Sequence, residues 1–176
     1  QYNLALQASD ILGSQVLLTA GDMRDRTRRR NLQNTLNELL SWRVLPILNE
    51  NDAVSTEEIQ FGDNDSLASQ VAIMMKAERV VLLTDVDGLY DSDPSKNKKA
   101  SLIHYRAKVG EPEFQMARNK SKSKQGTGGM YSKLLAADRA SKAGITTHLV
   151  LGDHPRNLLE IAAGKTIGTQ IGGKTK

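Results

Sequence analysis

The sequence predicts an α/β fold in which helices cover both faces of a mainly parallel sheet. Short apolar runs alternate along the chain with segments of helical periodicity, and such alternation pairs strands in parallel through crossover helices. The apolar runs are strand-sized, and none approaches the roughly 20 residues that a membrane helix needs. With 176 residues, 39% of them hydrophobic, the chain can bury one core, so a single domain spanning residues 1–176 is expected.

The first elements follow from the spacing of apolar residues. Residues 15–19 (QVLLT) form a strand-sized run, and residues 22–42 carry leucines at helical intervals. A second strand is predicted at residues 44–48, although Pro46 cannot donate a ladder hydrogen bond and favours a strand edge or end. A polar loop at residues 49–62 follows.

The second half continues the alternation. Residues 63–77 are predicted to be helical and residues 80–83 (VVLL) to form a buried strand. Residues 84–128 hold turn signals, charge and little periodicity, so a hairpin or flap insertion outside the core is expected there. The remaining predicted elements are a helix at 131–143, a strand at 146–151 and a helix at 155–163.

Ligands of such folds bind beyond the carboxyl ends of the strands, and polar residues follow the second predicted strand. Asn49 and Asp52 belong to the segment NEND, whose amides and carboxylates suit a zwitterion such as an amino acid. A plain turn rich in Asn and Asp explains the same residues. Residues 61–65 (FGDND) then crowd a helix start with carboxylates; one serves as the cap, the helix dipole favours a second, and Asp65 could hold lysines in position.

Two further segments suggest a nucleotide site. Thr84 and Asp85 end the buried strand and turn through Gly88, where they could reach a nucleotide or form a capped turn. Residues 124–133 (KQGTGGMYSK) form a glycine-rich loop that opens a helix, with Lys133 in its first turn. Glycines let backbone N–H groups approach phosphate oxygens, and the helix start and the lysine add positive charge. The sequence motifs of a Walker A loop and of the protein kinases are absent.

Composition places weaker limits on function. The net charge is +4 and the pI about 9.3. The basic cluster at residues 24–30 also fits a solvated helix face with Asp22 as its cap, and the cluster at residues 120–124 also fits a solvated loop. The chain has no cysteine, so it can build neither a disulfide nor a thiolate metal site. A reducing compartment is therefore permitted, and a cytoplasmic location is expected.

Four short motifs, taken together and in this order, resemble the glutamate 5-kinases of the amino acid kinase family, and the likeness extends from Val16 to Thr169. It implies a three-layer α/β/α sandwich, and transfer of the γ-phosphoryl group of ATP, with Mg²⁺, to the side-chain carboxylate of L-glutamate in the first step of proline biosynthesis. It also implies feedback inhibition by proline and a homo-oligomer. The motifs are residues 49–52, 62–65, 83–85 with 88–90, and 126–130 with Lys133.

The resemblance also implies roles for individual residues. Lys133 would neutralise charge on the transferring phosphoryl group and Asp65 would orient lysines, since a carboxylate nucleophile needs positioning and positive charge rather than a base. Magnesium would bridge phosphate oxygens, with few or no protein ligands. Glutamate would be bound by Asn49, Asp52, Asp63 and Asn64, and ATP by Thr84, Asp85, Thr127, Gly128, Gly129, Met130, Tyr131, Ser132 and Lys133.

The departure from the family pattern lies at the beginning. The chain starts at Gln1, and the first strand and lysine- and glycine-bearing loop of the family do not appear, so we expect an amino-terminally truncated domain. Three alternatives stay open. They are an amino acid kinase for aspartate, N-acetylglutamate, carbamate or UMP; an inactive regulatory fragment of the same fold; and a module that binds nucleic acid through the basic clusters, which leaves the acidic loops unexplained.

Overall fold

The computed structural model describes residues 2–54, 63–120 and 129–173. They divide into two compact units, Gln1–Leu67 and Ala68–Lys176, and each is described by itself. The single domain spanning residues 1–176 stays a prediction. None of the helices in the described ranges is long and apolar enough to span a membrane.

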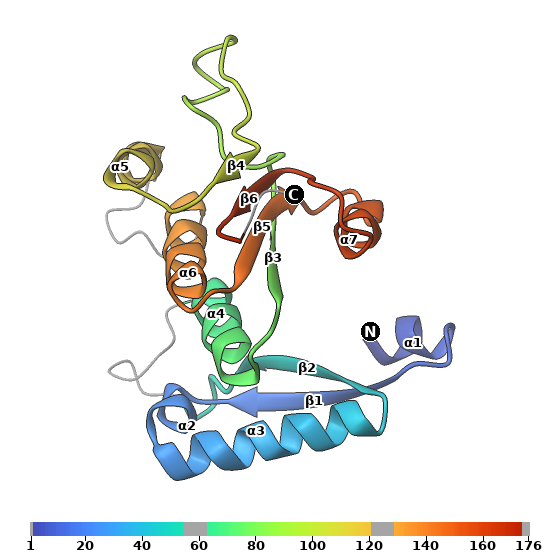
Figure 1. Cartoon of the computed structure of the whole chain (residues 1–176). Coiled ribbons are helices and arrows are strands. Elements are labelled where there is room, and N and C mark those ends of the chain that lie inside the picture. The colour runs from blue at the N-terminus through green and yellow to red at the C-terminus, as the bar shows by residue number, and fades with distance from the viewer. Residues whose placement is uncertain (1, 55–62, 121–128, 174–176) are drawn as a thin grey trace. The chain divides into compact units, whose positions relative to one another are not determined.

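The first unit pairs two parallel strands with a long helix (Figure 1). The strands β1 and β2 align from Leu12 opposite Val44 to Leu18 opposite Glu50. Leu32 and Leu36 point from the helix α3 into the core of this unit, as their helical spacing predicted. The elements are α1 (Tyr2–Gln7), β1 (Leu12–Leu18), α2 (Ala20–Arg24), α3 (Arg26–Ser41) and β2 (Val44–Glu50).

The helix predicted at residues 22–42 is two helices, and its predicted cap is wrong. Thr19 caps α2 by accepting a hydrogen bond from the backbone N–H of Asp22, whose carboxylate accepts in return from the backbone N–H of Thr19 at 2.7 Å. Asp25, with an extended backbone, then caps α3 through the N–H of Arg28 at 2.8 Å. A second strong capping residue so close to the first therefore ends α2 after five residues.

The second unit contains a four-stranded sheet in the order β3-β5-β6-β4. Strands β3 and β5 are parallel, β4 and β6 are parallel, and β5 and β6 are antiparallel. The helix α4 (Asn64–Met75) runs from the first unit into the second. The other elements are β3 (Arg79–Thr84), β4 (Tyr105–Arg106), α5 (Glu111–Lys120), α6 (Met130–Lys142), β5 (Thr146–Leu151), α7 (Arg156–Ala162) and β6 (Thr169–Ile171).

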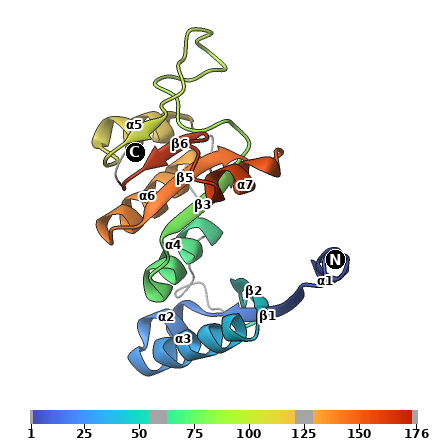
Figure 2. The same ribbon diagram turned by 45° about the vertical axis from the view of Figure 1, so that its right-hand side comes forward.

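Helices cover both faces of this sheet, as predicted (Figures 1 and 2). Side chains alternate along a strand, so Leu82 and Leu149 face the same way and join the core cluster with Leu134 of α6. His148 points to the opposite face, where it lines a pocket with Ile161 of α7. The unit therefore has three layers: helices α5 and α6, the sheet, and helix α7. The predicted α/β sandwich with mainly parallel strands is confirmed.

The expectation that residues 84–128 stay outside the core is wrong in part. Four of their side chains are buried in the core cluster, namely Leu89, Ile103, Val109 and Ala117. Strand β4 pairs with β6, and Tyr90 forms an isolated antiparallel bridge with Leu102. The core residues of this segment are separated by turns rather than repeated at one period, so periodicity could not reveal them.

Candidate functional site

The carboxyl ends of β3 and β5 form one edge of the second unit, which we call the carboxyl edge. Thr84 ends β3 opposite Leu151, which ends β5, and the N–H of Gly152 donates to the carbonyl of Thr84 at 2.8 Å. The Thr84 hydroxyl donates to the carboxylate of Asp85 at 3.1 Å, and Asp85 is exposed. Both residues therefore lie at the strand end predicted for them, with polar atoms open to a ligand.

The helix α6 begins at the same edge. It packs on the sheet through Leu134 and leads through a short connection into the start of β5, so it runs antiparallel to β5 and its first residue lies near the end of that strand (Figure 1). Thirteen residues of helix span about 18 Å and six residues of strand about 17 Å, so the two lengths match. The structure therefore brings the start of α6 and the end of β3 to one side of the unit.

The first turn of α6 follows a glycine N-cap and contains the predicted lysine. Gly129, at the N-cap, has a positive φ of 88° and makes no side-chain cap hydrogen bond, so no side chain of its own covers the first N–H groups of the helix. Ser132 turns its hydroxyl back to the Gly129 carbonyl at 3.0 Å, and half-buried Lys133 occupies the first turn. Thr127 and Gly128 lie outside the described residues.

Helix α5 holds the first turn of α6 in place through Tyr131. Arg118 donates to the Tyr131 hydroxyl at 3.2 Å and its guanidinium lies 5.2 Å from the ring centre, while Phe114 meets the ring edge-on at 5.8 Å. Tyr131 and Met130 pack against the core. These contacts give both residues a structural role, and their predicted role in binding ATP stays a prediction. Arg118 was not predicted from the sequence, because no local pattern links it to a residue 13 positions away.

The loop after β3 is anchored by residues from the far end of the chain. The hydroxyl of Thr169, which is fully buried, accepts from the N–H of Leu89 at 2.8 Å and donates to the carbonyl of Ile103 at 2.6 Å. A Cβ on Gly88 would lie 2.6 Å from that hydroxyl oxygen, so only glycine fits. Gly168, with φ of 66°, likewise leaves no room for a Cβ beside the carbonyls of Leu149 and Asp87.

Residues 168 and 169 therefore set the path of the loop that carries Asp85. In the sequence they stand out only as the end of the family resemblance. A buried threonine after glycine in the apolar run IGTQI was the available signal.

The predicted substrate residues Asn49 and Asp52 lie at the end of β2 and in the turn that follows it. Asn49 belongs to β2 rather than to a loop, because the strand continues to Glu50 and the ladder continues into the bond from the Asn51 N–H to the Leu18 carbonyl at 2.7 Å. Asp52 lies in a turn closed by the bond from the Val54 N–H to the Asn51 carbonyl, and it is exposed. The loop predicted to begin at residue 49 thus begins two residues later.

The acidic cluster at the start of α4 contains a structural cap. Asp63 accepts from the N–H of Ser66 at 2.6 Å, so one of its carboxylate oxygens serves the helix. Asn64 is exposed and Asp65 is half-buried in the first turn. Residues 55–62, including Gly62 of the motif, lie outside the described residues. Substrate binding by Asp63 and Asn64 and a positioning role for Asp65 stay predictions.

In the loop after β3, a hydrogen bond changes the pKa of one tyrosine. The Tyr90 hydroxyl donates to Asp87 at 3.0 Å, and this hydrogen bond, with smaller effects of burial and of the Asp87 charge, raises the pKa of Tyr90. Within the ranges that the structure describes, no group of three His, Asp or Glu side chains is arranged to hold a metal ion.

Comparisons with known proteins agree with the fold. The sequence model of the amino acid kinase family matches residues 1–151. The chain is 43% identical over 170 residues to the glutamate 5-kinase of Chromobacterium violaceum and 44% identical over 174 residues to that of Methylibium petroleiphilum. These matches cover 97% and 99% of the chain. They cover 45% and 46% of the relatives, so the chain spans about half the length of the curated relatives that it matches.

Solved structures with the same fold are more distant in sequence. An isopentenyl phosphate kinase superposes with a TM-score of 0.65 at 20% identity, over 95% of this chain and 62% of the other. UMP kinase from Ureaplasma parvum superposes with a TM-score of 0.60 at 16% identity, over 97% of this chain and 64% of the other. At these identities the likeness concerns the fold alone.

Proposed function

The chain belongs to the amino acid kinase family, and on that premise we propose that it forms part of an enzyme that phosphorylates the γ-carboxylate of L-glutamate with ATP. The observation that carries the proposal is the identity of 43–45% with relatives named glutamate 5-kinase, which extends over 97% of this chain. The geometry of the carboxyl edge supports the nucleotide half of it.

The nucleotide half uses the start of α6 and the end of β3. The backbone amides at the start of α6 and the ammonium group of Lys133 would bind phosphate oxygens, because a helix start favours negative charge. Thr84 and Asp85, at the end of β3, would bind the nucleoside. Thr127 and Gly128 complete the proposed loop.

The acceptor half uses polar groups of the first unit. The exposed carboxylate of Asp52 would pair with the ammonium group of glutamate, and the amides of Asn49 and Asn64 would orient its carboxylates. Asp63 has one oxygen engaged with the Ser66 N–H and would bind through the other. Asp65 would orient lysines rather than touch the substrate.

The chemistry requires alignment and charge neutralisation. The γ-carboxylate is already ionised at neutral pH, so no residue has to remove a proton before it attacks phosphorus. Holding two anions in line is the main barrier, and Lys133 together with the helix amides would lower it. Magnesium, when bound, would neutralise part of the phosphate charge. A cytoplasmic location, a homo-oligomer and proline as feedback inhibitor complete the proposal.

Nucleotide binding can be tested on the chain itself by calorimetric titration with MgADP. Replacing Lys133 with Gln should weaken binding about tenfold, the effect of losing about 1.4 kcal/mol of charge interaction. Lys142→Gln is the matched control, because Lys142 lies in the last turn of the same helix, exposed and paired with Asp138 at 2.6 Å. Equal affinities of the two variants would contradict the assigned role of Lys133.

The acceptor can be tested by trapping acyl phosphate with hydroxylamine. Glutamate should give hydroxamate, while aspartate and N-acetylglutamate should give little. Lys133→Gln should lower the rate on the order of 10²-fold, by analogy with the loss of one oxyanion donor. A preference for aspartate, or ADP release with UMP as acceptor, would favour another member of the family.

A further inference from the structure

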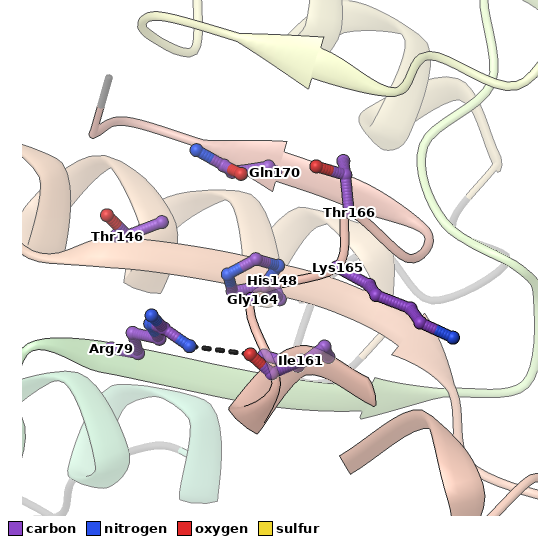
Figure 3. A pocket seen from close by; sticks show the side chains of 8 residues that line it. All are labelled: Arg79, Thr146, His148, Ile161, Gly164, Lys165, Thr166 and Gln170. Carbon is purple, nitrogen blue, oxygen red and sulfur yellow. Dashed lines mark hydrogen bonds between the residues drawn. The ribbon is translucent and has the colours of Figure 1, made fainter. Parts of the chain in front are cut away.

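A polar cavity of about 110 Å³ lies on the α7 face of the sheet, at the amino-terminal ends of β3 and β5 (Figure 3). Arg79 and Thr146 begin these two strands, His148 follows on β5, and Gln170 comes from β6. Lys165, in the segment after α7, closes another side. The volume exceeds the space that a single water molecule occupies, so a small polar ligand fits.

The lining of this cavity is positively charged. Arg79 is fixed there by donating to the carbonyl of Ile161 at 2.6 Å, which leaves its other N–H groups for a ligand. Lys165 pairs with Glu160 at 3.4 Å and is largely exposed, so its ammonium group can turn at little cost. The eight side chains drawn in Figure 3 include no carboxylate. An anion is therefore the favoured guest.

His148 is the most deeply buried titratable residue that lines the cavity. It is 4% exposed, and its Nδ1 atom is buried without a hydrogen-bond partner among the described residues. Burial and, to a lesser degree, the charge of Arg79 lower the pKa of His148, which favours the neutral form of the ring. A buried ring nitrogen without a partner is rare in folded proteins, so His148 brings an unsatisfied polar group to the wall of the cavity.

We propose that this cavity binds a small oxyanion, the phosphate or carboxylate group of a small molecule, with Arg79 as the principal cation and His148 and Thr146 as hydrogen-bonding partners. The site is distinct from the carboxyl edge. Arg79 and Thr84 are the two ends of a six-residue strand, which spans about 17 Å. The inference therefore stands independently of the proposed kinase function.

The test is a titration of the 176-residue chain with inorganic phosphate, and separately with acetate, at constant ionic strength. The imidazole resonances of the histidines report where the anion binds, and His104 and His154, both exposed, serve as internal references. We expect saturable shifts of the His148 resonances with a Kd on the order of 1 mM. Stronger binding of phosphate would point to a phosphorylated ligand, and stronger binding of acetate to a carboxylic acid.

The variant Arg79→Gln should weaken this binding at least tenfold, while its amide can still donate to the Ile161 carbonyl. Arg156→Gln is the control, because Arg156 is an exposed arginine of α7 that does not line the cavity. Lys165→Gln provides a second lining variant and should weaken binding less. The proposal is overturned if neither anion shifts the His148 resonances of the unmodified chain, or if Arg79→Gln and Arg156→Gln weaken binding equally.

Discussion

The substitution Thr169→Val should loosen the loop after β3 without changing the shape of the core. Valine has nearly the volume of threonine but has no hydroxyl, and the hydroxyl of Thr169 joins residues that are 80 and 66 positions away. Its loss leaves the N–H of Leu89 and the carbonyl of Ile103 buried without that partner.

The expected magnitude follows from these two groups. A buried polar group that loses its partner costs about 1–3 kcal/mol, so Thr169→Val should lower the unfolding free energy of the second unit by about 3 kcal/mol. Thr169→Ser keeps the hydroxyl and removes one buried methyl group, which should cost about 1 kcal/mol.

Amide hydrogen exchange measures the effect where it arises. In Thr169→Val the amide of Leu89 should exchange faster than the amides of α6, because the loop opens locally before the unit unfolds. In Thr169→Ser the exchange rates of these amides should keep the order that they have in the unmodified chain. If serine destabilises the unit as much as valine does, methyl packing rather than the two hydrogen bonds anchors the loop, and the reasoning is refuted.

Two further predictions concern titrating groups. Asp87→Asn should lower the pKa of Tyr90 toward its ordinary value, because the carboxylate accepts the phenolic hydrogen bond and opposes ionisation; an ultraviolet titration compared with that of Tyr90→Phe isolates this phenol, and an unchanged pKa would contradict it. Burial alone would raise the pKa of Glu113, but hydrogen bonds from the Gly110 N–H and from Arg106 outweigh burial and lower it. Stability from Glu113 should therefore be present above its unfolded pKa of about 4.3 and be lost as pH falls. In Glu113→Gln the unfolding free energy, measured with denaturant, should fall less steeply as the pH is lowered. An unchanged pH dependence would count against this interpretation.

Much of the fold could be predicted because it depends on local patterns. The strand ending at Thr84 and the helix starting near Gly129 follow from apolar runs and a glycine-rich start. The break between α2 and α3 was missed, because Asp22 and Asp25 both suit a helix cap and only the bonds that they make distinguish them. Asp63 was one of the candidates for the cap of α4, and the structure selects it.

The sequence by itself determined the alternation of strands and helices and the edge at which Thr84, Asp85 and Lys133 belong, since neighbours along the chain suffice to predict both. Only the tertiary structure decided that Thr169 anchors the loop after β3 and that Arg79 and His148 share a cavity on the opposite face from the core. These contacts join segments far apart along the chain, and they depend on strand order and register, which periodicity within one segment does not encode.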